Sequence, residues 1–150
     1  RMRIRSSQLI KAPVERVFEV FADIANCAGR IKGITKVEVL SETRSGLGLR
    51  WRETRVLFGK EATEEMEVTA FDAPKSYVVE ARSHGMHYVT TFTFEPGAGA
   101  GSTQVSWVFD GKALSLGAKL MTPLMLLFKG ATEKMMKQDL LDLKAYLENA

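Results

Sequence analysis

The C-terminal quarter of the chain carries its most apolar segment, residues 114–128, which is rich in methionine and leucine and contains Pro123. From Leu120 onward, apolar residues recur at helical spacing in two stripes. The first stripe consists of Leu120, Leu124, Leu127, Phe128, Ala131 and Met135, and the second of Met136, Leu140, Leu143 and Leu147. At about 100° per residue the stripes point in different directions. The pattern predicts one long helix or two abutting helices, in which 114–128 borders a cavity and the second stripe packs tightly.

The middle of the chain alternates apolar and polar residues instead. Six strands are predicted at 34–43, 47–57, 61–71, 76–82, 86–95 and 103–110, joined by short turns that mostly contain glycine. An earlier strand covers 2–11. Two short helices follow it; the first begins at Pro13 and buries Val14, Val17, Phe18, Phe21 and Ile24. This order predicts an α+β fold with a seven-stranded antiparallel sheet, apolar on one face, curled around the long C-terminal helix.

Composition is that of a globular protein, with 45% hydrophobic and 26% charged residues over 150 positions. This length predicts a single domain over residues 1–150. Residues 1–60 carry 13 Lys or Arg and 6 Asp or Glu, whereas residues 61–110 carry 2 and 8. Because no run of like charges occurs, we expect no nucleic-acid partner. The asymmetry instead predicts a basic group of strands beside an acidic group, which favours cross-strand pairing.

Cysteine usage and the N-terminal residues bear on location. Cys27 is the only cysteine, which suits a reducing compartment, and no apolar leader segment is visible after Arg1. Lys119 and Pro123 interrupt residues 114–128, which are too short to span a bilayer. We therefore expect a soluble, cytoplasmic protein.

Five short motifs, taken in order, are similar to those of a known family. They are Ile10-Lys-Ala-Pro-Val-Glu-Arg-Val-Phe18 with Asp23, Gly48-Leu-Arg-Trp-Arg52, Phe71-Asp-Ala-Pro74, Gly101-Ser-Thr-Gln-Val105 and Leu140-Leu-Asp-Leu-Lys-Ala-Tyr-Leu-Glu148. Over nearly its whole length the chain resembles the START/Bet v 1-like superfamily, specifically the bacterial SRPBCC or polyketide cyclase/dehydrase-like branch. The resemblance implies a helix-grip fold with a deep cavity for hydrophobic ligands between the sheet and the C-terminal helix. It implies no fixed catalytic set.

Aromatic and methionine side chains of predicted inward parity could line that cavity. Taken singly, each is more often an ordinary core residue, but as a set they favour a ligand site. The predicted ligand-binding residues are Phe21, Trp51, Glu53, Met66, Tyr88, Phe92, Trp107, Phe109, Met121, Leu124, Met125 and Phe128.

Glu53 is the one weak catalytic candidate, because its parity matches that of Leu49 and Trp51. A desolvated carboxylate could act as an acid or a base on a bound substrate. Two alternatives stay open: Arg55 neutralises it, or a bulge exposes it. The pair His84 and His87 flanks a turn and lacks an obvious third ligand, so we expect no metal site.

Three function classes remain. The preferred one is a binding or carrier protein for a hydrophobic lipid, polyketide or aromatic compound, with no cofactor and without turnover. The second is a polyketide cyclase/dehydrase-type enzyme. The third is a membrane- or quinone-associated carrier that docks through residues 114–128, although membrane contact is not what we expect. Either a monomer or a homodimer is compatible with the sequence.

Overall fold

The computed structural model of the protein describes residues 1–57 and 59–149. All seven of its strands belong to one antiparallel sheet in the order β1-β7-β6-β5-β4-β3-β2. The strands are β1 (Met2–Ile10), β2 (Ile34–Val39), β3 (Arg50–Leu57), β4 (Lys60–Asp72), β5 (Ser76–Ser83), β6 (Met86–Pro96) and β7 (Thr103–Ala113). The helices are α1 (Val14–Ala22), the 3-10 helix η1 (Ile24–Gly29), α2 (Leu116–Leu127) and α3 (Lys129–Glu148).

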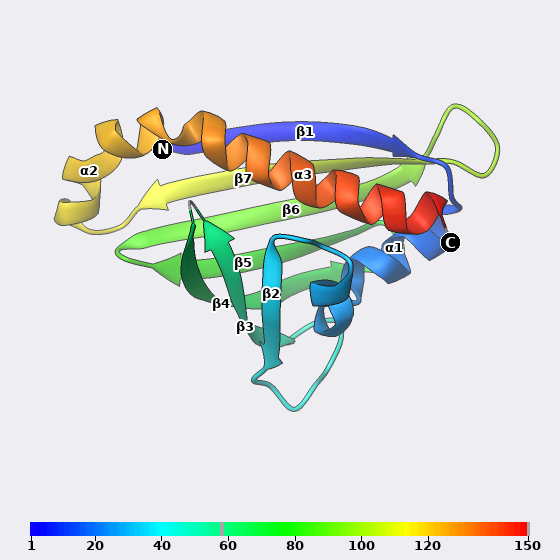
Figure 1. Ribbon diagram of the computed structural model, residues 1–150, viewed down its shortest axis with the longest axis horizontal. Helices are drawn as coiled ribbons and strands as arrows, with labels where there is room; N and C mark the ends of the chain where they lie inside the picture. Colours follow the sequence, from blue (N-terminus) through cyan, green and yellow to red (C-terminus); the bar gives the residue numbers. More distant parts are fainter. Residues whose placement is uncertain (58, 150) are drawn as a thin grey trace.

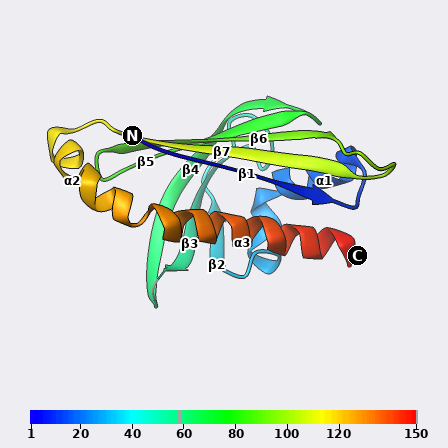
Figure 2. The same cartoon turned by 90° about the horizontal axis from the view of Figure 1, so that it is seen from above.

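The sheet curls around one side of α3. In Figure 1 the helix crosses in front of β7, β6 and β5, and in Figure 2 β3 and β2 turn down beside it. Strands β2 to β7 form a meander, and β1 pairs with β7 from Met2 opposite Gly111 to Ile10 opposite Thr103. The predicted α+β helix-grip fold is confirmed.

Burial follows the patterns expected from the sequence over the first 30 residues. Met2, Ile4 and Ile10 of β1 are buried, as are Val17 and Phe21 of α1. Proline at position 13 precedes the first turn of α1, where its missing N–H leaves no hydrogen bond unmade. The helix α1 packs against the inner face of the sheet, at the end of the sheet where α3 ends (Figure 1).

Opposite charges face each other across β3 and β4, as the charge distribution predicted. Arg50 lies opposite Glu67 and Arg52 opposite Glu65. Arg52 Nη2 donates to Glu65 Oε1 at 2.8 Å. Both side chains of this pair are well exposed, so the contact sets the pairing of the strands more than it adds to stability.

Polar residues on α3 tie the helix to backbone groups that would otherwise lack partners. Asp142, which is buried, accepts a hydrogen bond from the Lys32 N–H at 3.0 Å. At the end of the helix Glu148 accepts from the Lys11 N–H at 2.8 Å. These contacts fix α3 to the segments before β2 and after β1, in addition to its apolar packing.

The expectation for the first half of the C-terminal segment was largely wrong, whereas Leu140, Leu143 and Leu147 of the second half are buried as expected. The helix breaks at Phe128, and α2 projects beyond the end of the sheet (Figure 1). Its direction is set at its first turn, because the Leu114 N–H donates to the Gly85 carbonyl of the β5–β6 turn at 2.7 Å. Most of residues 114–128 is therefore exposed, and α3 forms the helical wall of the cavity.

Leucines of α3 and α2 should differ sharply in their contribution to stability. Leu140 is 3% exposed in the core, whereas Leu120 is 73% exposed. We expect Leu140→Ala to lower the free energy of unfolding by about 2–5 kcal/mol, because it removes buried surface and leaves a void. Leu120→Ala should change it by less than about 0.5 kcal/mol. Urea unfolding of both variants measures this difference, and equal losses would contradict the burial described.

Candidate ligand-binding site

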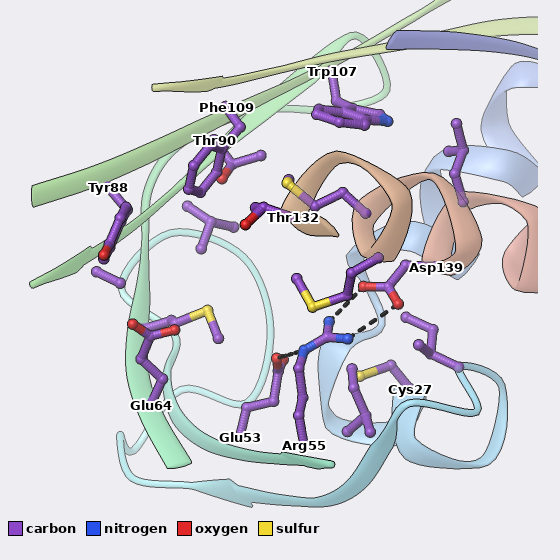
Figure 3. A pocket seen from close by; sticks show the side chains of 18 of the residues that line it. Cys27, Glu53, Arg55, Glu64, Tyr88, Thr90, Trp107, Phe109, Thr132 and Asp139 are labelled. Carbon is purple, nitrogen blue, oxygen red and sulfur yellow. Dashed lines mark hydrogen bonds and ion pairs between the residues drawn. The ribbon is translucent and has the colours of Figure 1, made fainter. Parts of the chain in front are cut away.

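A cavity of about 460 Å³ lies between the inner face of the sheet and α3. Its walls come from β3 to β7, from η1 and the start of β2, and from one side of α3 (Figure 3). Most of the lining is apolar, and Met135, Met136, Leu140 and Leu143 form the helical wall. Met125 and the half-exposed Phe128 border it as well, so the cavity reaches the surface where α2 meets α3.

Most of the predicted lining residues do surround this cavity. The ten that do are Phe21, Trp51, Glu53, Met66, Tyr88, Phe92, Trp107, Phe109, Met125 and Phe128. Met121 and Leu124 were expected there and are not among the lining residues. They are 50% and 45% exposed, because α2 extends past the sheet and only its last residues reach the cavity.

Stacked aromatic rings form part of the sheet-side wall. Tyr88 and Phe109 stack at 5.5 Å between ring centroids, and Tyr77 stacks on Phe92 at 4.8 Å. The hydroxyl of Tyr77 donates to the Phe21 carbonyl at 3.2 Å, which satisfies its polar end in the core. The sequence analysis missed Tyr77, although its place opposite Phe92 on the neighbouring strand follows from the strand register.

One buried guanidinium holds two carboxylates beside the apolar lining. Arg55 Nε donates to Glu53 Oε2 at 2.7 Å, and Arg55 Nη1 donates to Asp139 Oδ1 at 3.1 Å (Figure 3). A second hydrogen bond from Nη2 to the same Asp139 makes that contact bidentate. Glu53 also lies 3.5 Å from the indole nitrogen of Trp51. Of the two alternatives open for Glu53, neutralisation by Arg55 is the one observed, and a bulge that exposes it is not.

Burial and these ion pairs shift the pKa values of the cluster. Desolvation raises the pKa of Asp139 above its ordinary value, against the opposing effect of Arg55. Burial alone would lower the pKa of Arg55, but Asp139 and Glu53 together raise it. Burial, followed by the charge of Glu53, raises the pKa of the nearby Cys27 thiol to about 12, so this cysteine is a neutral lining group.

A second acidic side chain enters the cavity from β4. Glu64 lies directly opposite Glu53 in the pairing of β3 with β4. Figure 3 shows its carboxylate on the same side of these two strands as the carboxylate of Glu53. Burial raises its pKa, and the charge of Glu53 raises it further. The sequence analysis treated this strand only as part of an acidic group and did not single out Glu64 among its four glutamates. The signal that could have found Glu64 is its pairing with Glu53.

Neither histidine forms a metal site. His87 Nε2 lies 2.7 Å from Glu80 Oε1, and His84 Nδ1 lies 2.7 Å from the Ser83 hydroxyl. Within residues 1–57 and 59–149, no group of three or more His, Cys, Asp or Glu side chains could hold a metal ion. Over the same residues, no helix combines the length and the apolar character needed to cross a bilayer.

Residues 1–148 match the model of the family described as polyketide cyclase / dehydrase and lipid transport. The chain belongs to this family. The match spans every element that builds the cavity, and it agrees with the resemblance to the START/Bet v 1-like superfamily found in the sequence motifs. Its description covers both binding and catalytic members, so membership leaves the choice between these roles to the site itself.

Several solved structures share the fold of this family member, although their sequence identity to it is low. The protein TTHA0849 from Thermus thermophilus is 21% identical with a TM-score of 0.70, over 97% of this chain and 99% of that one. A START superfamily protein from Mycobacterium smegmatis is 13% identical with a TM-score of 0.75, over 98% and 97%.

One domain of a larger biosynthetic protein has the same fold. This is the di-domain ARO/CYC protein BexL of the BE-7585A biosynthetic pathway, 16% identical with a TM-score of 0.74. The similarity covers 99% of this chain and 47% of that one. No curated protein matches the chain. At these identities the structures establish the fold alone.

Replacing Arg55 should reveal the cost of two carboxylates left without their cation, Glu53, which is buried, and Asp139, which is partly buried. We expect Arg55→Met to lower the free energy of unfolding by about 3–5 kcal/mol near neutral pH. The pKa of Asp139 in the folded state already lies above the unfolded value of about 3.9, and loss of the guanidinium raises it further. A carboxyl with a raised folded pKa contributes stability below its unfolded pKa and loses it as the pH rises through the folded pKa. The deficit of the variant should therefore shrink as the pH is lowered toward 5.

Urea unfolding at several pH values measures this deficit. Arg52→Met is the matched control, because Arg52 pairs with Glu65 at the surface and should cost at most about 1 kcal/mol. A deficit for Arg55→Met that is small, or that does not change with pH, would contradict the buried cluster.

Proposed function

We propose that the protein binds an uncharged, largely apolar small molecule in this cavity and carries it without turnover. The observation that supports the proposal is a cavity of about 460 Å³ whose lining is mostly aromatic, aliphatic and methionine side chains. That volume is typical of sites for small organic ligands, and methionines adapt to ligands of varied shape. Burial of apolar ligand surface is favourable by about 25 cal/mol per Å² before association costs, so micromolar affinity needs no charged contact.

The charges around the cavity narrow the class of ligand. Among the described residues that line the cavity, Glu53, Glu64 and Asp139 accompany one Lys or Arg side chain, Arg55, which is already engaged by two of these carboxylates. A ligand carboxylate would add a further negative charge next to Glu64 without a free cation to meet it. Two like charges about 8 Å apart repel by about 2 kcal/mol at an effective dielectric constant of 20. A neutral alcohol, phenol, ketone or ester avoids this repulsion.

The second candidate function, catalysis of the cyclase type, is supported by the properties of Glu64 alone. Glu64 is the cavity carboxyl with a raised pKa and without an ion pair to Arg55, so it is the group best suited to hold a proton near a bound molecule. A neutral carboxyl can also simply donate a hydrogen bond to a ligand oxygen. We favour binding because the remaining polar groups of the cluster are occupied with one another.

Ligands with the same chain and different headgroups test the proposal. Trp51 and Trp107 both line the cavity, so titration with decanol should change tryptophan emission with a dissociation constant in the micromolar range. At pH 8 decanoate should bind at least about tenfold more weakly than decanol, the factor that corresponds to about 1.4 kcal/mol. Its binding should tighten as the pH falls through the raised pKa of Glu64.

Glu64→Gln should reduce the difference between decanol and decanoate and remove the pH dependence that lies above the range in which decanoate itself becomes protonated. Glu65→Gln is the matched control, because the adjacent Glu65 is exposed and pairs with Arg52 outside the cavity. Absence of any response to decanol, decylamine or decanoate would overturn the binding proposal. Equal affinity for decanol and decanoate would overturn the ligand class. Conversion of a polyketide-like chain that disappears in Glu64→Gln would establish the enzyme instead.

A further inference from the structure

Helix α2 presents a leucine stripe that nothing else in the described chain covers. At about 100° per residue, Leu116, Leu120, Leu124 and Leu127 lie within about 80° of one another around the helix. Leu116, Leu120 and Leu127 are 74%, 73% and 78% exposed, and Leu124 is also exposed. The opposite side of the helix carries Ala118, which is buried, and Met125, which lines the cavity. The exposed stripe is therefore the outward face of a helix whose inner face is already packed.

The position of this helix is determined by its base. Ser115 caps the first turn, where its hydroxyl accepts a hydrogen bond from the Ala118 N–H at 3.1 Å. A Cβ added to Gly85 would lie 2.3 Å from the Ser115 hydroxyl oxygen, so the β5–β6 turn and the helix start are in close contact. With its first turn held in this way, α2 keeps its exposed leucines on the side opposite the buried Ala118, and the helix lies at the end of the molecule (Figure 2).

The charged residues in α2 and next to it in the sequence are of one sign. Residues 111–132 contain Lys112, Lys119 and Lys129 and no Asp or Glu. Lys119 is on α2 itself, about 60° from the edge of the leucine stripe at Leu116. Within residues 1–57 and 59–149, none of these three lysines takes part in an ion pair. A projecting apolar ridge with cations beside it matches the interface of a bilayer that contains anionic lipids.

We propose that α2 is a membrane-docking helix, which inserts Leu116, Leu120, Leu124 and Leu127 into the interface of an anionic lipid bilayer. Its 12 residues span about 18 Å, against a hydrocarbon core of about 30 Å, so the helix lies in the plane of the surface. A second copy of the chain fits this surface less well, because pairing two such faces would bring lysines together without acidic partners. The proposal takes up the third function class of the sequence analysis, docking through residues 114–128, which was possible but not the expected one.

Docking in this orientation places the cavity opening next to lipid. Two residues that border the cavity belong to this region: Met125 lies on the inner face of the docking helix and Phe128 directly follows its last residue. An apolar molecule could then pass between bilayer and cavity with little exposure to water. The docking surface itself does not depend on the proposed ligand binding, since it is the outer face of α2 and the cavity lies on the inner side.

Sedimentation with lipid vesicles tests the proposal on the full chain. The protein should bind vesicles of phosphatidylcholine with added phosphatidylglycerol more strongly than vesicles of phosphatidylcholine alone, and high salt should weaken the difference. The double variant Leu120→Asp, Leu127→Asp should lose at least tenfold in vesicle binding. Lys119→Gln should lose about fivefold, the factor that corresponds to about 1 kcal/mol.

Leu47→Asp is the matched control, because Leu47 is a 65% exposed leucine in the loop between β2 and β3 and should not change vesicle binding. Circular dichroism and decanol binding without vesicles show whether the α2 variants keep their fold and cavity. Lack of vesicle binding by the wild-type protein would overturn the proposal. So would a dimer in analytical ultracentrifugation that is lost in the α2 double variant, because the stripe would then face a second copy. Equal loss of vesicle binding in Leu47→Asp would overturn it as well.

Discussion

The buried guanidinium of Arg55 is the interaction on which the cavity depends. It joins Glu53 of the same strand to Asp139 of α3, and so connects the curled side of the sheet to the helix across the space between them. The C-terminal end of α3 is held by buried Leu143 and Leu147 together with the hydrogen bonds that Asp142 and Glu148 accept from backbone N–H groups. Around Arg55 and toward the start of α3 the sheet and the helix stay apart, and large side chains line the gap without filling it. A buried ion pair of this kind adds little net stability over apolar residues of similar volume, so its value here lies in the geometry that it fixes.

The same cluster sets the electrostatic character of the interior. Once Arg55 is shared between two carboxylates, it has little attraction left for a ligand anion. Glu64, which faces the cavity from the neighbouring strand, is not paired with Arg55 and therefore sets the charge inside the cavity. Most of the cavity surface is therefore apolar, and its unpaired charge is negative. This combination is the basis of the proposed preference for neutral ligands over fatty acids, which needs no change in the shape of the cavity.

The fold could be predicted from the sequence because its signals are periodic and local. Alternation along the strands, the helical spacing after Pro13 and the opposed charges of β3 and β4 each recur over many residues. The site was predicted less completely. Arg55 was considered only as a partner for Glu53, because its contact with Asp139 joins positions that lie 84 residues apart in the chain. The helical wall of the cavity was assigned to residues 114–128 and not to α3 because both segments are apolar, and periodicity does not reveal where the sheet ends. That end is set by the β5–β6 turn at Gly85, which directs α2 away from the cavity.

Methionine methyl signals offer the most direct measurement of whether the cavity binds a ligand. Of the seven methionines, Met2, Met66, Met125, Met135 and Met136 line the cavity, whereas Met86 and Met121 do not. Met86 is buried and Met121 is half exposed, so the two provide internal controls for a general change in the core and at the surface. With carbon-13 labelled methyl groups, decanol should shift the signals of the lining methionines and leave those of Met86 and Met121 unchanged. Shifts confined to Met121, or equal shifts at all seven, would contradict binding in this cavity.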